Sequence, residues 1–294
     1  MKLGIGLPQM MPTGLDRGML LEWARRADEA GFHSLGTVDR PNYDSWEPLV
    51  TLAAAAAVTE QIRLATTILQ LSNRNETLVA KQAAVVDRLS EGRLDLGVAP
   101  GMRQDDFSVF GAELSERRRF RTQVARIREV WQLARQSTEQ HGNVGPAPVQ
   151  NPGPPVWIGA ATPDGIRRAT EIADAFVFTA ALPPERIGEM IPDLRSRAQA
   201  NGKTDFGFHA IAYCAVGDPD EVLAIAGAQL LRYYRNPDMP FDKIVHRGST
   251  DDLAAVARRY ADSGVDSLIL MPLVPSLDQV EALARDVLPE YATP

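Results

Sequence analysis

The sequence predicts a (β/α)8 barrel, an α/β fold in which eight parallel strands alternate with helices. Short apolar runs bounded by glycine or proline alternate with longer segments of helical periodicity. The strand-like runs are apolar at consecutive positions, which is typical of parallel strands buried on both faces. Eight such units occupy 294 residues, a length that suits this barrel as one domain over residues 1–294.

The eight predicted strands share one pattern. Each is a run of apolar and β-branched residues that ends near a glycine, a proline or a charged residue. The third reads RLATTILQL and the fourth RLDLGVA. The strands are predicted at residues 2–7, 33–38, 63–71, 93–99, 156–160, 175–179, 207–216 and 266–272.

Helices are predicted between the strands, where apolar residues recur every three or four positions. Gly31 follows the first helix at a position that favours a helix end, and Pro48 lies in the first turn of the second. The fourth helix carries several arginines, and it is followed by a Gly/Pro-rich stretch that we interpret as an extended crossover at 142–155. The helices are predicted at residues 20–30, 48–60, 77–89, 115–135, 163–173, 184–200, 219–234, 249–263 and 277–291.

An open, doubly wound sheet is the competing architecture. The first strand is not followed by G-x-G-x-x-G, which disfavours the dinucleotide-binding form of that fold. Three similar stretches, ADEAGFHSL, ATEIADAFV and YADSGVDSL, each end a helix and begin a strand. These echoes favour a repeated strand–helix unit.

Composition excludes several classes of protein. The net charge is −7 and the basic residues are dispersed, so no nucleic-acid partner is expected. The single cysteine, Cys214, excludes an intramolecular disulfide and lies in an apolar run that predicts a buried, inert thiol. The N-terminus has no long apolar core of a signal peptide, and the stretch 52–58 is far shorter than the ~20 residues of a membrane helix. We therefore expect a cytoplasmic protein without a membrane partner.

The function of a (β/α)8 barrel is located at the carboxyl ends of its strands. The most informative sequence there is GAATPDG at 159–165, after the fifth strand. Small residues allow close approach of a ligand, Thr162 can cap the next helix, and the first amides of that helix then suit a phosphate. An ordinary capped helix start is the alternative.

Metal and triad chemistry are not supported. The four histidines, His33, His141, His209 and His246, form no pair at ligand spacing, and no G-x-S-x-G is present. Few titratable residues follow the predicted strands. This pattern favours a protein that holds a reactive cofactor over one that relies on its own acids and bases.

Several segments together resemble the luciferase-like monooxygenase superfamily, also called the bacterial luciferase family. The longest is AKQAAVVDRLSEGRLDLGVAPGMRQDDFSVFG at 80–111. GFHSLGTVDR, PPVWIGAATPDGIRRATEIADAFVF, YADSGVDSLILMP and DVLP match further family segments in the same order. The resemblance covers nearly the whole chain and implies a (β/α)8 barrel.

The resemblance also implies a cofactor and partners. Members of the family use reduced FMN with oxygen, or the deazaflavin coenzyme F-420 for hydride transfer. Many are dimers, so a homodimer is expected here. A partner flavin reductase would supply reduced FMN, and the substrate would be a small organic molecule.

Carried onto this chain, the resemblance assigns the cofactor pocket. It implies a non-prolyl cis peptide at Thr67–Ile68 beneath the flavin ring and a rim formed by Gly101, Met102 and Arg103. The cofactor phosphate would lie on the loop that contains Gly159, Ala160, Ala161, Thr162 and Gly165. Asp105, Asp106, Phe107 and Phe110 are expected to be structural.

Departures from the family pattern narrow the chemistry. Alcohol-oxidising deazaflavin members carry a His where this chain has Arg40 and a Glu where it has Met102. Luciferase also has a His at the position of Arg40, and it carries a reactive Cys where this chain has Ala99. The sequence therefore favours an FMN monooxygenase. An F-420-dependent reductase or dehydrogenase, or a non-catalytic barrel subunit, are the alternatives.

Asp39, Arg40 and Arg103 are the candidate catalytic residues. Either arginine would orient an anionic substrate or stabilise negative charge that develops on oxygen. Asp39 would either orient Arg40 or accept from a backbone amide. Because the insert before the fifth strand is short, an open or differently covered pocket is expected. Four aromatic residues either line that pocket or are ordinary packing residues: Tyr43, Trp46, Tyr233 and Tyr234.

Overall fold

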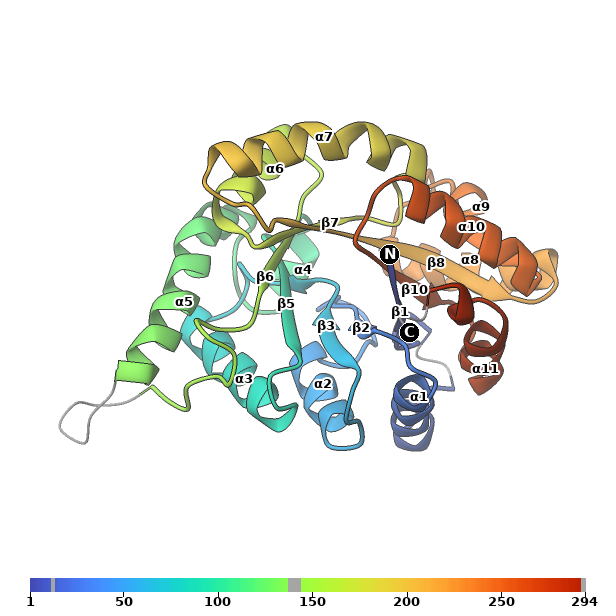
Figure 1. Ribbon diagram of the computed structural model, residues 1–294, viewed down its shortest axis with the longest axis horizontal. Helices are drawn as coiled ribbons and strands as arrows, with labels where there is room; N and C mark the ends of the chain where they lie inside the picture. The colour runs from blue at the N-terminus through green and yellow to red at the C-terminus, as the bar shows by residue number, and fades with distance from the viewer. Residues whose placement is uncertain (12–13, 137–143, 292–294) are drawn as a thin grey trace.

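The computed structural model describes residues 1–11, 14–136 and 144–291 (Figure 1). Eight parallel strands close into a barrel, because the last strand pairs with both the first and the seventh. In barrel order they are β1 (Lys2–Gly6), β2 (Ser34–Thr37), β3 (Arg63–Thr66), β5 (Leu94–Ala99), β6 (Val156–Gly159), β7 (Ala175–Phe178), β8 (Gly207–Val216) and β10 (Ser267–Pro272). The predicted (β/α)8 barrel is confirmed.

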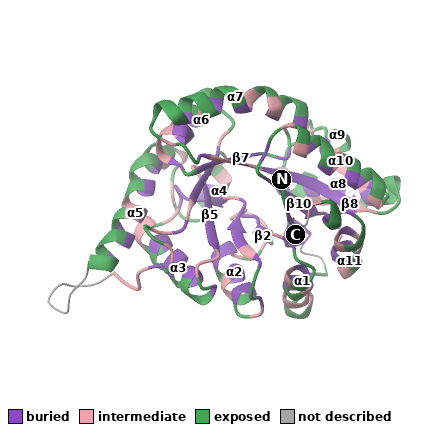
Figure 2. Ribbon diagram, in the orientation of Figure 1, coloured by how far each residue is buried: buried purple, intermediate pink, exposed green. Residues whose placement is uncertain are grey.

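Helices surround the barrel (Figure 1). They turn exposed faces outward while the strands are buried (Figure 2). They are α1 (Arg17–Glu29), α2 (Pro48–Ala56), α3 (Glu76–Leu89), α4 (Gln104–Ser108), α5 (Phe120–Gln136), α6 (Pro163–Ile172), α7 (Pro184–Ala200), α8 (Pro219–Tyr234), α9 (Phe241–Ile244), α10 (Thr250–Asp262) and α11 (Leu277–Asp286). Two 3-10 turns, η1 (Leu114–Arg119) and η2 (Leu288–Glu290), and two short strands, β4 (Leu69–Gln70) and β9 (Val245–Gly248), complete the chain.

The apolar core has two parts. The larger part fills the layer between the strands and the helices, where Trp23 and Trp131 are fully enclosed. The second part is the barrel interior, with side chains such as Trp157, Ile211 and Ile269. The interior cluster also contains Ala226, Leu230 and Tyr233 of α8, so the barrel core continues directly into this helix.

The structure corrects several predicted elements. The third predicted strand is divided into β3 and β4 at the Thr67–Ile68 peptide, which is cis as the resemblance implies. The second helix ends at Ala56 instead of residue 60, because the amides of residues 60–62 turn away to donate to the Asp28 carboxylate. The fourth helix starts with η1, and the last ends at Asp286 before η2.

Three short elements were not predicted: α4, α9 and β9. Each has only four or five residues, too few for a periodic signal, and β9 contains His246 and Arg247. Of the expected crossover, residues 144–155 are irregular as predicted, while residues 142–143 and His141 lie outside the described residues.

Candidate active site at the barrel mouth

The carboxyl ends of the strands gather most of the predicted site residues at one end of the barrel, which we call the mouth. Asp39 and Arg40 follow β2, and Gly101, Met102 and Arg103 follow β5. Thr67 and Ile68 lie between β3 and β4. The loop from Gly159 to Gly165 follows β6, and a Cβ built on Gly159 would lie 2.2 Å from Cδ1 of Ile68. The β3–β4 break and the β6 end are therefore in direct contact.

Asp39 does not orient Arg40. Its carboxylate accepts two hydrogen bonds from the Arg74 guanidinium, at 2.7 and 3.1 Å, and one from the backbone amide of Gln70 at 2.7 Å. Burial raises the pKa of the Asp39 carboxyl and the Arg74 charge opposes that shift. The structure thus favours the second predicted role of Asp39, an acceptor for a backbone amide at the strand end.

Arg40 pairs with Asp106 instead. Nη1 of Arg40 lies 2.8 Å from Oδ2 of Asp106, whose side chain is fully buried. The same carboxylate also accepts from the Gln70 side chain and from the Asn42 amide, each at 3.2 Å. Asp106 was expected to be structural, and here its role is to hold the Arg40 guanidinium at the mouth. Nε of Arg40 and Oε1 of Gln70 are buried without a hydrogen-bond partner.

Arg103 holds the end of α8. Its Nη1 donates to the backbone carbonyls of Tyr233 and Tyr234, at 3.1 and 2.9 Å, while its other nitrogens bind Asp105. Asp105 also accepts from Arg235 at 2.8 Å. Of the other rim residues, Gly101 has a φ of +83° and is packed against Phe107, whereas the Met102 side chain is 68% exposed. Met102 therefore lies outside the enclosed part of the mouth.

The last turn of α8 contacts two strand ends at the mouth. Tyr233 lies under the Arg40 guanidinium, 4.6 Å from ring centroid to Cζ, and edge-on to Tyr43 at 5.2 Å. The Tyr234 hydroxyl bonds to the hydroxyl of Tyr213 on β8, which is far from β2 around the barrel. The two α8 tyrosines therefore cover part of the mouth, which agrees with the predicted alternative of a differently covered pocket. Trp46 is 38% exposed and does not join this cluster.

The loop predicted to bind the cofactor phosphate leads into α6. Thr162 accepts from the amide of Gly165 at 3.2 Å, and Pro163 occupies the first turn. A Cβ on Gly165 would lie 2.8 Å from Cβ of Ala160, so the loop is closely packed there, while Ala161 and Thr162 are exposed. Arg168, one turn into α6, has a buried Nε without a hydrogen-bond partner. Burial lowers the pKa of Arg168, and the charges of Arg121, Arg167 and Arg117 lower it further.

His33 and His209 lie at the amino end of the barrel, and His246 of β9 packs edge-on against Tyr260 of α10. His209 stacks on Trp157 at 4.0 Å and bonds to Ser267 at the amino end of the barrel, where burial lowers its pKa to about 3. Burial also lowers the pKa of His33 to about 4. Cys214 is buried as predicted, and burial raises its pKa. Within the described ranges, no group of three His, Cys, Asp or Glu residues forms a candidate metal site, and no helix is long and apolar enough to cross a membrane.

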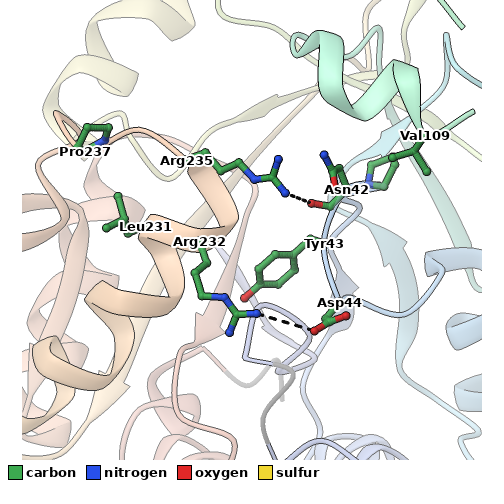
Figure 3. A pocket seen from close by; sticks show the side chains of 9 residues that line it. Asn42, Tyr43, Asp44, Val109, Leu231, Arg232, Arg235 and Pro237 are labelled. Atoms are coloured by element: carbon green, nitrogen blue, oxygen red, sulfur yellow. Dashed lines mark hydrogen bonds and ion pairs between the residues drawn. The ribbon is translucent and has the colours of Figure 1, made fainter. Parts of the chain in front are cut away.

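A groove of about 850 Å³ lies beside the mouth, between the loop after β2 and the end of α8 (Figure 3). Arg235 reaches across it to the carbonyl of Asn42, and Arg232 faces Asp44 at 3.9 Å. The groove is lined by Pro41, Asn42, Tyr43, Asp44, Val109, Leu231, Arg232, Arg235 and Pro237.

Sequence reasoning named Gln70 and Arg74 at the end of the third strand without giving them a role, and it missed Arg168 and Tyr213. Gln70 and Arg74 lie at the end of the third predicted strand, and polar residues at strand ends mark the site of a barrel. Tyr213 lies in an apolar run that carries no such signal, and Arg168 is one of many helix arginines.

A closed parallel barrel with charged side chains at the carboxyl ends of its strands is a (β/α)8 barrel whose candidate site lies at the end where this fold carries its active sites. The chain belongs to the luciferase-like monooxygenase family, whose model matches residues 2–284. Members of this family are oxidoreductases and monooxygenases that depend on a flavin or on coenzyme F-420.

Solved structures with the same fold span both cofactor types. The monooxygenase RslO1 from Streptomyces bottropensis has a TM-score of 0.82 and 24% identity over 99% of this chain and 100% of its own. An F-420-dependent secondary alcohol dehydrogenase, solved with an F-420–acetone adduct, has a TM-score of 0.77 and 18% identity over 99% of each chain. The oxygenating constituent of 3,6-diketocamphane monooxygenase from Pseudomonas putida, solved with FMN, has a TM-score of 0.75 and 16% identity over 100% of this chain and 99% of its own. At these identities the likeness shows the fold.

Proposed function

We propose that this protein is an FMN-dependent monooxygenase that uses reduced flavin and O2 on a small organic substrate. One observation carries the choice within the family: the three carboxylates at the mouth are each held by an arginine. Asp39 is bound by Arg74, Asp106 by Arg40, and Asp105 by Arg103. Oxidation of an alcohol by hydride transfer needs a base for the hydroxyl proton, and carboxylates held by arginines are poorly suited to that task. Oxygenation by a flavin places no such demand on these side chains.

The residues present fit a phosphate-bearing flavin. The α6 start offers backbone amides with the positive end of the helix dipole, and the unpartnered Nε of Arg168 lies one turn away. The orphaned polar atoms of Arg40 and Gln70 lie at the mouth, where the ring system would bind. Bound reduced FMN would supply the electrons that activate O2.

The chain's own residues then have three tasks. The α6 start and Arg168 would bind the phosphate, and the Arg40 guanidinium would stabilise negative charge that develops on oxygen. The tyrosines of α8 would exclude water from the mouth. Because no dinucleotide fingerprint follows the first strand, we propose that a separate reductase supplies the reduced flavin.

A cofactor titration tests this function. Purified protein is titrated with FMN and with coenzyme F-420, each oxidised and reduced under anaerobic conditions, and binding is followed by fluorescence. We expect reduced FMN to bind most tightly. A preference for F-420 would replace the proposal with hydride transfer, and binding of neither would leave only the fold.

We further propose that the protein is a homodimer through α2 and α3. These two helices pack side by side and expose apolar side chains: Val50 is 64% exposed, Leu78 55% and Leu89 51%. Leu78, Val85 and Leu89 are seven and four residues apart and so share one helix face. An exposed apolar face of this kind supports the proposed interface.

Val85→Glu/Leu89→Glu is expected to convert a dimer, of twice 32.1 kDa, into a monomer. Two charges would be buried without partners at the interface, which is costly. Light scattering coupled to size-exclusion chromatography measures the mass. Leu133→Glu, at an exposed position on α5, is the control and should leave the dimer intact. A wild-type protein that is monomeric at micromolar concentration would contradict the proposal.

A further inference from the structure

The phenol ring of Tyr234 lies in an aromatic cage at the mouth. Its hydroxyl bonds to the Tyr213 hydroxyl, and its ring centroid is 5.1 Å from that of Tyr233 and 6.2 Å from that of Phe241. The Arg40 guanidinium lies 5.8 Å from the same ring. The Tyr234 phenol is therefore in contact with three aromatic rings, those of Tyr213, Tyr233 and Phe241. The Tyr213 hydroxyl and the Arg40 cation complete the cage, which lies at the end of the barrel where substrates bind.

Tyr213 is distinctive within the barrel interior. It lies on β8 among side chains that are mostly aliphatic, such as Ile211, Ile269 and Met271, and is 6% exposed. Burial raises its pKa, so the hydroxyl keeps its proton and can donate a hydrogen bond. In this structure the partner of that hydroxyl is not another barrel residue but the last residue of α8.

The segment that carries Tyr234 lies between two glycines with positive φ. It runs from Gly217 to Gly248, with φ of +149° and +139°, values that side-chain-bearing residues rarely adopt. Arg235, next to Tyr234, has a left-handed φ of +50°, which is strained for a residue with a side chain. The contacts of Arg235 with Asp105 and Asn42 are solvent-exposed, and an exposed ion pair contributes little to stability. The end of α8 is held instead by the buried Tyr233 ring and by Arg103, which donates to the carbonyls of Tyr233 and Tyr234.

The groove of Figure 3 gives access to this place. Tyr43 lines the groove, and its ring packs edge-on against Tyr233, the neighbour of Tyr234. A ligand that displaces the Tyr234 ring would enter the cage from this side.

We propose that Tyr234 occupies the substrate site with its own side chain, and that the substrate is an aromatic molecule whose hydroxyl or carbonyl oxygen hydrogen-bonds to Tyr213. The identification of this ligand as a substrate rests on the proposed function, whereas the site itself is defined without a cofactor. The Tyr213 hydroxyl positions the substrate oxygen, and the Arg40 charge favours an electron-rich ring.

The test compares two ligands of matched size, 2-naphthol and 2-methylnaphthalene, in equilibrium titrations without any cofactor. Wild-type protein is expected to bind 2-naphthol more tightly. Tyr213→Phe should reduce that preference about three- to tenfold, the value of one hydrogen bond. Tyr260→Phe is the matched control, because the Tyr260 hydroxyl is buried without a partner on α10, and it should leave the preference unchanged.

A third variant tests whether the Tyr234 ring occupies the ligand site or forms part of its lining. Tyr234→Ala should tighten binding of both ligands, because the protein's own ring no longer competes for the cage. Weaker binding in Tyr234→Ala, no preference in the wild type, or a preference that survives Tyr213→Phe would each overturn the proposal. If the expected results are obtained but neither FMN nor F-420 binds, the cage is a ligand site and only the proposed function is wrong. If FMN binds and the preference is absent, only this inference fails.

Discussion

Replacing Arg40 by alanine is expected to lower the free energy of unfolding by about 3–5 kcal/mol, because it leaves the Asp106 carboxylate buried without its cation. The Asp106 side chain has no exposed surface, and the two contacts left to it, from Gln70 and the Asn42 amide, are both at 3.2 Å. Urea unfolding measures the change. Arg25→Ala removes an exposed pair with Glu22 and should cost no more than about 1 kcal/mol. A cost that small for Arg40→Ala would contradict the buried pair.

The double variant Arg40→Met/Asp106→Leu separates stability from chemistry. Exchanging both partners for apolar side chains should recover much of the stability, because no charge is left buried. Turnover should stay low if Arg40 acts on the reacting atoms, since the guanidinium over Tyr233 is gone. Full turnover in this variant would leave Arg40 with a structural role only.

Arg168→Gln is expected to weaken FMN binding by about tenfold or more, because a hydrogen bond from a charged donor contributes about 1.5–3 kcal/mol. The unpartnered Nε of Arg168 near the α6 start is the basis for this expectation. Affinity is measured by fluorescence titration with FMN and with riboflavin, which has the same ring system and no phosphate. Riboflavin binding should not change.

The control for Arg168 is Arg195→Gln on α7. Both guanidinium groups lie over a phenylalanine ring, Arg168 at 5.3 Å from Phe120 and Arg195 at 5.4 Å from Phe208. Arg195→Gln should leave the affinity for FMN unchanged. Equal losses for FMN and riboflavin in Arg168→Gln would show a disturbed pocket instead of a lost phosphate contact.

Much of the barrel was readable from local pattern. The predicted bounds of α7 and α8 agree with the structure, and the starts of α2 and α6 follow from their proline residues. Helix periodicity, capping residues and apolar runs depend on neighbours within a few positions, so the sequence reports them directly. The resemblance added the cis peptide at Thr67–Ile68.

The partners within the mouth were decided by the tertiary structure. Arg40 and Asp106 are 66 positions apart in the sequence. Arg74, which follows a different strand from Asp39, donates to the Asp39 carboxylate. Tyr213 meets Tyr234 only because α8 turns back over the mouth after β8. By itself, the sequence determined the strand–helix order, and with it the end of the barrel where polar residues gather. Which of those residues pair depends on barrel closure, which brings distant strand ends within hydrogen-bond distance and leaves no trace in local periodicity.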